Sequence, residues 1–264
     1  MEKLKNAAII GYCIGLAGMV FPQFFYMVFG PNFFPPFPGL PLVPVWVCLF
    51  TVVALAACFC IAFNKQPVRV SLILGGLLLL MFCFGFAPYE LFVDPNNKHL
   101  GSWANGLKES ALSGGAFVVA GILPSDPDIQ KSPILKFLEK LVPLGKIFFC
   151  ITMIAYGYAH FLYTQPISTL VPNWIPGHIF WTYFAGVALM ASGLAIVLGI
   201  KRRLSAFLLG TMILLWLIVL HIPMAVADPY SQNANSVVSA FSALAFSAIA
   251  FGIACEPFFK RKGE

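Results

Sequence analysis

The chain has 264 residues, of which 60% are hydrophobic and 10% are charged, and its mean hydropathy is +0.89. A water-soluble domain of this length has too little interior for so many apolar side chains, so lipid must be the second solvent. The net charge of +6 does not indicate nucleic-acid binding, because the basic residues stand in short clusters between apolar runs, the pattern that orients membrane proteins.

Eight apolar runs are long enough to cross the hydrocarbon core of a bilayer. Each is predicted to be helical, because backbone amides in lipid must be paired within their own segment. The first run is interpreted as a span and not as a signal peptide, since no small-residue cleavage site follows it. The fourth carries Lys108 and Glu109 in its first turn, where the helix dipole favours the anion and Lys108 neutralises it. The predicted spans are Ala7–Phe29, Val43–Phe63, Val68–Ala87, Leu107–Leu123, Leu144–Tyr163, Ile179–Ile200, Leu204–Ile222 and Val237–Cys255.

The basic residues give the orientation of these spans. With eight spans and an inner N-terminus, only Lys98 and Lys108 of the 16 Lys and Arg residues fall outside the inner segments. Such a one-sided distribution is what the positive-inside rule requires. Both termini are therefore predicted to be cytoplasmic, in the inner (plasma) membrane of a cell.

The two halves of the sequence resemble each other. Four identities occur at a spacing of 135 residues, where Pro41, Trp46, Gly75 and Pro88 recur as Pro176, Trp181, Gly210 and Pro223. An even number of spans in each half predicts a parallel repeat, unlike the inverted repeats of many transporters. The predicted fold is all-α: two tandem parallel four-helix bundles over residues 1–124 and 144–264, with a cytoplasmic linker over residues 125–143.

Three histidines are the most informative polar residues. His160, His178 and His221 lie near the outer ends of the fifth, sixth and seventh predicted spans, at a similar depth. Neutral imidazole can ligate haem iron or a metal, or hydrogen-bond a quinone carbonyl. In the first half Phe86 is matched to His221 and Phe21 to His160, so a site belongs to the second half. The alternative is that these side chains lie among lipid headgroups, bonded to water or backbone; His160 and His221 are the better candidates.

Several aromatic residues of the second half are candidates for lining a pocket for a flat ligand, with Tyr158 and Trp181 as the proposed contacts. The alternative is an interfacial aromatic belt. The set comprises Tyr156, Tyr158, Tyr163, Tyr183, Trp174, Trp181 and Trp216.

Other chemistries have little support in the sequence. The seven cysteines form no CxxC motif and are interpreted as small buried apolar residues, with a bridge between Cys48 and Cys83 left open. Phosphate-binding loops, HExxH and GxSxG motifs are absent. No predicted span carries an acidic residue near its middle, which argues against an ion-driven carrier.

Five stretches of the second half carry a resemblance to a known family: Gly157–Phe161, Leu170–His178, Phe180–Gly186, Ala191–Leu194 and His221–Pro223. With about residues 145–255 around them, they resemble the DoxX-like family of small four-helix membrane proteins. A typical member is one bundle, so this chain resembles a tandem form with a divergent first copy. The resemblance implies an association with quinone-linked oxidoreductases, in particular the membrane part of a thiosulfate:quinone oxidoreductase. Other relatives resemble parts of oxidative-stress complexes, assembly factors or cargo receptors.

The resulting hypothesis is an accessory membrane subunit of a quinone-linked redox or oxidative-stress system, with a redox enzyme subunit as partner. A quinone or haem would lie near His160 and His221, at the outer end of the second bundle. One alternative is an envelope scaffold, assembly factor or lipid-binding protein without a redox role. Another is a small-molecule transporter.

Overall fold

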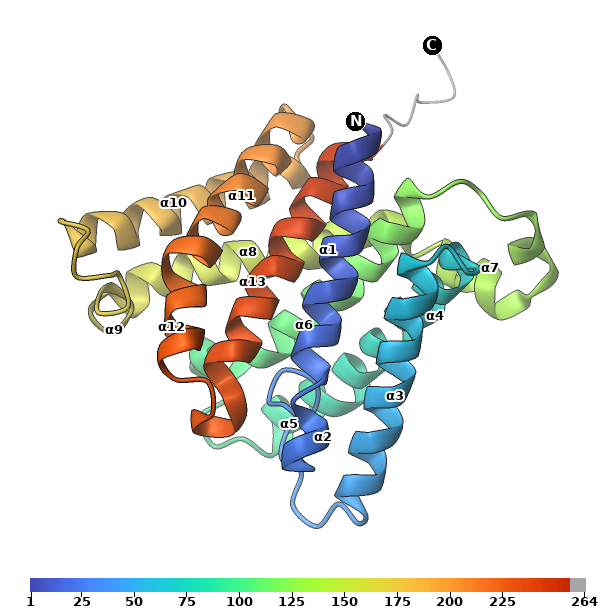
Figure 1. The fold of residues 1–264 in the computed structure, drawn as a ribbon, viewed down its shortest axis with the longest axis horizontal. Coiled ribbons are helices and arrows are strands. Elements are labelled where there is room, and N and C mark those ends of the chain that lie inside the picture. Colours follow the sequence, from blue (N-terminus) through green and yellow to red (C-terminus); the bar gives the residue numbers. More distant parts are fainter. Residues whose placement is uncertain (257–264) are drawn as a thin grey trace.

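The structure, a computed structural model, describes residues 1–256, and every regular element in that range is a helix (Figure 1). The prediction of an all-α fold is confirmed. The long helices are α1 (Glu2–Val20), α3 (Val43–Ala62), α4 (Pro67–Met81), α6 (Leu100–Ile122), α8 (Gly145–Leu162), α10 (His178–Val197), α11 (Arg202–Trp216) and α13 (Ser231–Cys255). The short ones are α2 (Gln23–Tyr26), α5 (Ala87–Phe92), α7 (Pro133–Glu139), α9 (Thr164–Ser168) and α12 (Ile222–Ala227).

Six helical stretches within the described residues are long and apolar enough to cross a membrane. Two predicted spans, Leu107–Leu123 and Leu144–Tyr163, fall on α6 and α8, which are not among the six. The number of eight spans therefore stays a prediction. The six stretches are Glu2–Tyr26, Val43–Ala62, Pro67–Phe92, His178–Val197, Arg202–Ala227 and Ser231–Cys255.

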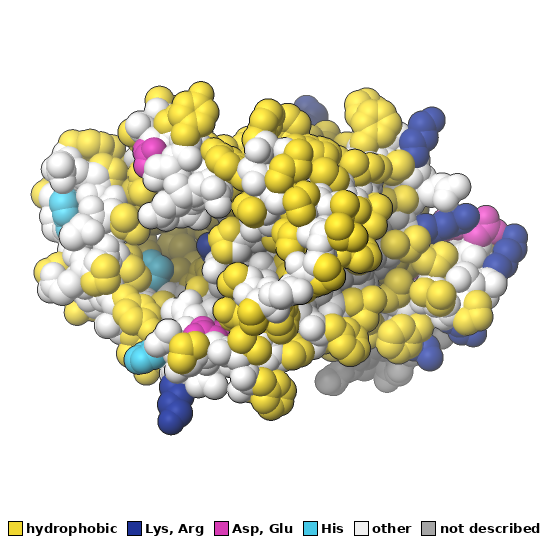
Figure 2. All heavy atoms as spheres, turned by 90° about the horizontal axis from the view of Figure 1, so that it is seen from below, with side chains coloured by type: hydrophobic (Ala, Val, Ile, Leu, Met, Phe, Trp, Pro, Cys, Tyr) yellow, Lys and Arg dark blue, Asp and Glu magenta, His cyan; other side chains and the backbone are white. Residues whose placement is uncertain are grey.

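Large apolar side chains cover much of the outside of the molecule (Figure 2). On α3, Val45 is 58% exposed and Leu49 and Val52 are each 54% exposed. Contiguous apolar surface of this kind is unfavourable in water, whereas lipid tails solvate it well. The exterior is therefore that of a membrane protein.

Two helices contain a turn of π-helix at equivalent places. These turns are η1 (Phe82–Phe86), between α4 and α5, and η4 (Leu217–His221), between α11 and α12. Pro88 and Pro223 follow at the second residue of α5 and α12. Because proline has no N–H and its ring crowds the carbonyl four residues earlier, the wider π turn lets each helix continue past it.

The two halves repeat the same helix order at the spacing found in the sequence. His178 and Val197, the ends of α10, stand 135 residues after Val43 and Ala62, the ends of α3. The same spacing separates α4 from α11, η1 from η4 and α5 from α12 at both ends. The repeat therefore extends over helix bounds and not only over four identical residues.

A hydrogen bond between helices is repeated as well. The Ser113 hydroxyl of α6 donates to the Gly75 carbonyl of α4, and the Ser247 hydroxyl of α13 donates to the Gly210 carbonyl of α11, each at 2.8 Å. Replacing either serine by alanine is expected to lower the free energy of unfolding by about 1 kcal/mol, the usual worth of such a bond. Denaturant titration in detergent measures it. Ser205→Ala, whose hydroxyl bonds to its own preceding turn, is the control and should have a smaller effect.

The two halves share one hydrophobic core. α1 packs along α13, α8 packs along α6, and α6 and α13 meet in the middle, so each half is completed by a helix of the other (Figure 1). Glycines permit the close approach: a side chain at Gly11 would meet Ala248, and one at Gly145 would meet the Gly114 carbonyl. The predicted division at residues 125–143 separates two repeats, and their cores are continuous.

The segment between the repeats is largely helical and is attached to α4. It contains two turns of 3-10 helix, η2 (Pro127–Lys131) and η3 (Val142–Leu144), on either side of α7. The Arg69 guanidinium at the start of α4 pairs with Asp126 at 2.6 Å and with Asp128. These partners, with Lys131 for Asp128, lower the pKa of both carboxyls below the ordinary value.

The lowered pKa values predict how the attachment depends on pH. The pairs of Arg69 with the two carboxylates stabilise the attached segment fully above about pH 4, the ordinary carboxyl pKa. This stabilisation is lost as the pH falls through the lowered pKa values of the folded protein. The protection of the backbone amides of residues 126–139 against hydrogen exchange, corrected for the intrinsic effect of pH on the exchange rate, is expected to fall at low pH. In Arg69→Met exchange should already be fast at neutral pH, and unchanged protection in that variant would contradict the pairing.

All seven cysteines are free thiols. Cys48 and Cys83 are therefore not bridged, and the Cys48 thiol lies 3.8 Å from the Met27 sulfur. Cys13, Cys58 and Cys150 are buried, as expected, whereas Cys83 is exposed.

Candidate functional site

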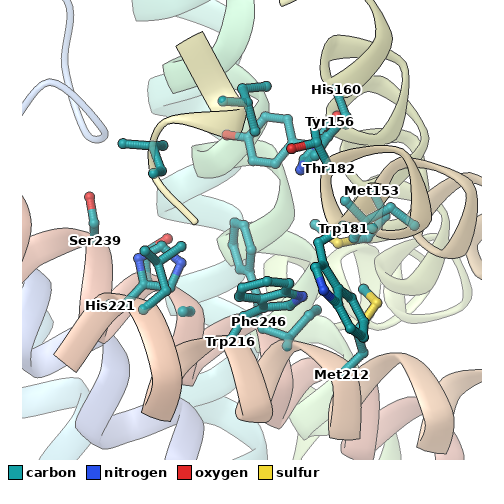
Figure 3. Close-up of a pocket in the computed structure, with 18 of the residues that line it drawn as sticks. Met153, Tyr156, His160, Trp181, Thr182, Met212, Trp216, His221, Ser239 and Phe246 are labelled. Carbon is teal, nitrogen blue, oxygen red and sulfur yellow. Dashed lines mark hydrogen bonds between the residues drawn. The ribbon is translucent and has the colours of Figure 1, made fainter. Parts of the chain in front are cut away.

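A cavity of about 310 Å³ lies among helices of the second repeat (Figure 3). Its walls come from α8, α10, α11, η4 and α13, and the segment between α8 and α10 closes one side with Ile167, Leu170 and Val171. One residue, Lys108, comes from α6 of the first repeat. The volume lies at the lower end of the range for small-molecule sites, which are mostly apolar with a few polar groups.

His160 forms part of one wall and is held by its own helix. Its Nδ1 lies 2.7 Å from the Tyr156 carbonyl oxygen. A carbonyl only accepts hydrogen bonds, so Nδ1 carries the proton and Nε2 keeps a lone pair. The Tyr156 hydroxyl donates to the Ala104 carbonyl at 2.7 Å, which fixes this turn of α8 against α6. His160 therefore presents a positioned hydrogen-bond acceptor or metal ligand.

His221 and Ser239 lie on the opposite side of the cavity from His160, Tyr156 and Thr182 (Figure 3). His221 is the last residue of the π turn η4, which sets its direction differently from that of a regular α-helix. Lys108 is close enough to act electrostatically on His221. This side of the cavity therefore gathers nitrogen and hydroxyl groups.

Trp181 and Trp216 form an aromatic wall between α10 and α11. Their ring centroids are 6.4 Å apart and their planes meet at 78°, an edge-to-face pair. Met212 and Phe246 extend this wall (Figure 3). The wall offers ring faces to a flat ligand.

Three predicted site residues, His160, His221 and Trp181, line the cavity together. Tyr158 and His178 do not line it. Tyr158 is 50% exposed, because it stands two residues before His160 and so about 200° away around α8. His178 begins α10 one turn outside the cavity, where its carbonyl accepts a hydrogen bond from the Thr182 hydroxyl.

The corresponding space in the first repeat is filled by phenylalanine. Phe86 stands where the second repeat has His221, and Phe50 where it has Ala185. Phe33 lies 5.3 Å from Phe50 between ring centroids, and Phe33 and Phe86 are almost fully buried. The cavity is thus open in the second repeat because Ala185 and His221 are smaller than Phe50 and Phe86 at the equivalent positions.

The helix contacts also correct the match made for His160. The contact of Gly11 with Ala248 is equivalent to the contact of Gly145 with Gly114. Equivalent residues of α1 and α8 are therefore 134 positions apart in the sequence. At that spacing Tyr26, and not Phe21, takes the place of His160.

The prediction for Glu109 is wrong. Helix α6 begins at Leu100, so Glu109 is its tenth residue and lies beyond reach of the N-terminal dipole. No ion pair joins it to Lys108 within residues 1–256, because neighbouring residues point about 100° apart on a helix. Its side chain is fully buried and both carboxyl oxygens lack a hydrogen-bond partner among the described residues.

No acidic residue was expected near the middle of a span, whereas Glu109 lies near the middle of α6 and is buried. Besides Glu109, Glu90 is only 4% exposed. Both carboxyls belong to the first repeat, away from the cavity. If α6 crosses the membrane as predicted, Glu109 removes this reason for excluding an ion-driven carrier.

Metal chemistry has no complete ligand set in the described part of the chain. No three His, Cys, Asp or Glu side chains of residues 1–256 converge to hold an ion. The arrangement is suited to binding a largely apolar molecule by shape and by a few hydrogen bonds.

Comparisons with known proteins place a family match on this same region. Residues 149–251 match the model of a domain of unknown function, DUF8561. The match begins in α8 and ends in α13, so it contains every wall of the cavity except Lys108. No curated protein and no solved structure matches the chain.

Proposed function

We propose that the protein spans the membrane eight times with both termini inside, and that it binds a quinone in the cavity of the second repeat as an accessory subunit of a redox system. The observation that carries the binding proposal is the cavity itself, with His160 held as an acceptor opposite the hydrogen-bond donors near His221. The resemblance to the DoxX-like family supports the redox role.

A quinone and its reduced form, the quinol, require opposite hydrogen-bond partners, and the cavity offers both a donor and an acceptor. A quinone carbonyl accepts a hydrogen bond, which the Ser239 hydroxyl or the Lys108 ammonium can donate. A quinol hydroxyl donates one, which Nε2 of His160 can accept. Trp181 and Trp216 supply aromatic surface for the ring. The electron donor would belong to a partner subunit.

Tryptophan fluorescence gives a direct test of binding. A bound naphthoquinone is expected to quench Trp181 and Trp216, so titration of the purified protein with 2-methyl-1,4-naphthoquinone should give a saturable signal. His160→Ala is expected to weaken binding of the reduced form, 2-methyl-1,4-naphthoquinol, about tenfold, as measured by its competition with the quinone. This is the cost of the hydrogen bond that the quinol hydroxyl donates to Nε2. Tyr158→Ala, on the same helix but outside the cavity, is the matched control.

The native preparation supplies the second half of this test. Protein purified in mild detergent is expected to release quinone on solvent extraction. A haem in place of a quinone would show as a Soret band in the absorption spectrum. A colourless preparation without quinone, in which wild type and His160→Ala bind the quinol equally well, contradicts the proposal.

Reporter fusions test the eight-span arrangement. Fusions after Asn97 and after Lys201 are expected to report the outer and inner sides, respectively. The first lies between α5 and α6, so it is on the outer side only if α4 crosses the membrane. The second lies between α10 and α11. It is on the inner side if α6 and α8 both cross the membrane, and also if neither of them does. A third fusion after Lys131 separates those cases, because it is inside only if α6 crosses.

Lipid binding without redox chemistry is a second candidate function. It is favoured by the apolar character of most of the cavity wall, which suits an acyl chain as well as a ring. Extraction that yields a stoichiometric lipid and no quinone would support it over the redox role.

A further inference from the structure

The positive charge of Lys108 is the feature of the cavity that the proposed function does not explain, because a neutral quinone carbonyl needs a hydrogen-bond donor and not a cation. Lys108 is the only Lys, Arg, Asp or Glu side chain among the cavity-lining residues of the described chain. It has no hydrogen bond or ion pair within residues 1–256, although it lies among apolar side chains and is partly withdrawn from the surface. Placing an unpaired ammonium group in such surroundings is unfavourable unless something else compensates its charge.

The surroundings of Lys108 exclude an internal counterion. The neighbouring carboxyl of Glu109 belongs to another face of α6 and points away from the cavity. Lys108 acts electrostatically on His221, which cannot be an anion, and Ser239 lies on the same side of the cavity as His221 (Figure 3). All of these groups can donate a hydrogen bond to a negatively charged oxygen.

We propose that the ligand of this cavity carries an acidic group, ionised when bound, that Lys108 and the hydroxyls of α13 hold while the apolar body lies against Trp181 and Trp216. This inference rests on the proposed cavity site and specifies its ligand class as an anionic amphiphile. The acidic group can belong to an ionised hydroxyquinone or to the carboxylate of a fatty acid.

The hollow on the lower face of the molecule fits this arrangement. Seen from that side, apolar side chains form the hollow, and basic and histidine side chains appear at its edge (Figure 2). A positive group at the mouth of an apolar cavity attracts anions from solution and from the membrane surface. The charged end of the ligand would therefore remain near the opening and its apolar end inside.

Two pairs of probes test the inference, each pair differing in charge on a similar apolar body. The first pair is 2-hydroxy-1,4-naphthoquinone, ionised at neutral pH, against 2-methyl-1,4-naphthoquinone, measured by tryptophan quenching. The second is laurate against dodecanol, measured by calorimetry. The anion of the pair that binds is expected to bind about 30-fold more tightly than its neutral counterpart, the scale of a desolvated charge pair.

Variants of Lys108 show whether this residue causes the preference. Lys108→Met should abolish the preference, and Lys108→Arg should retain it. Lys98→Met, which removes an equal charge from an exposed loop residue, should have no effect. Because the wild-type ratio is itself a test, the inference stays falsifiable if Lys108→Met fails to fold.

The outcomes separate this inference from the proposed function. Equal affinities within both pairs, or a preference that survives in Lys108→Met, would overturn the inference while quinone binding stands. Tight laurate binding without quinone binding would overturn the quinone proposal and support the anionic ligand. Absence of binding by all four probes would overturn both.

Discussion

Gly114→Ala is expected to disrupt the joint between α6 and α8 and to lower the free energy of unfolding by about 3 kcal/mol, the upper range for overpacking. A Cβ atom at Gly114 would lie 2.3 Å from the Gly145 carbonyl oxygen, and one at Gly145 would lie 2.6 Å from the Gly114 oxygen. Backbone atoms cannot rotate away as a side chain can, so the two helices must separate. The loss of contact would spread to both repeats, because this joint connects them.

Heating followed by size-exclusion chromatography measures this effect. The temperature at which half of the Gly114→Ala protein remains monodisperse should fall by several degrees. The matched control is Gly101→Ala in the same helix, where the nearest atom to a new Cβ is the Tyr163 hydroxyl oxygen at 3.6 Å. Since alanine is the better helix former, this control should be neutral or slightly stabilising. Equal heat resistance of the two variants would show that α6 and α8 are not in close contact.

Glu109→Leu is expected to stabilise the protein, by about 1–3 kcal/mol, which is the cost of leaving a buried polar group without a partner. Leucine has a similar volume and removes both orphan oxygens from an apolar environment. Glu109→Gln should give a smaller gain, because its amide remains polar and buried. Glu2→Gln at the exposed end of α1 is the control, with little change.

A stabilised Glu109→Leu protein also indicates why the carboxyl is present. Stabilisation at the expense of activity is typical of polar groups that are kept for function. The same heating assay, combined with the quinone titration, therefore distinguishes a carboxyl that is kept for function from one that has no role in binding. Destabilisation of Glu109→Leu would contradict the expectation that this carboxyl is buried without a partner.

The sequence was sufficient for the features that depend on local pattern. Hydropathy placed α3 and α10 within a few residues, and the identities that include Trp46 and Trp181 revealed the repeat spacing seen in the helix bounds. Helix α6 was placed less well: Ser102, Trp103 and Asn105 make its first two turns too polar for a hydropathy criterion, although they are helical. The error about Glu109 followed from that misplaced start.

The site was predictable only in part, because the local sequence pattern does not show which distant helices contact each other. His160 and His221 were identified by their type and depth, and they do line one cavity. Helical periodicity alone would have separated Tyr158 from His160, since two residues correspond to more than half a turn. Lys108 was missed because it belongs to the first repeat and reaches the cavity only through the packing of α6 on α8.

The packing of α1 along α13 has a consequence for biosynthesis. Helix α1 finds its main neighbour in α13, which is synthesised much later (Figure 1). Until α13 has been synthesised, the face of α1 that carries Gly11, Gly15 and Gly18 must therefore be covered by lipid or by an insertion factor. The contact between α1 and α13 therefore forms late, and nascent intermediates that lack α13 leave this side of α1 without its protein neighbour.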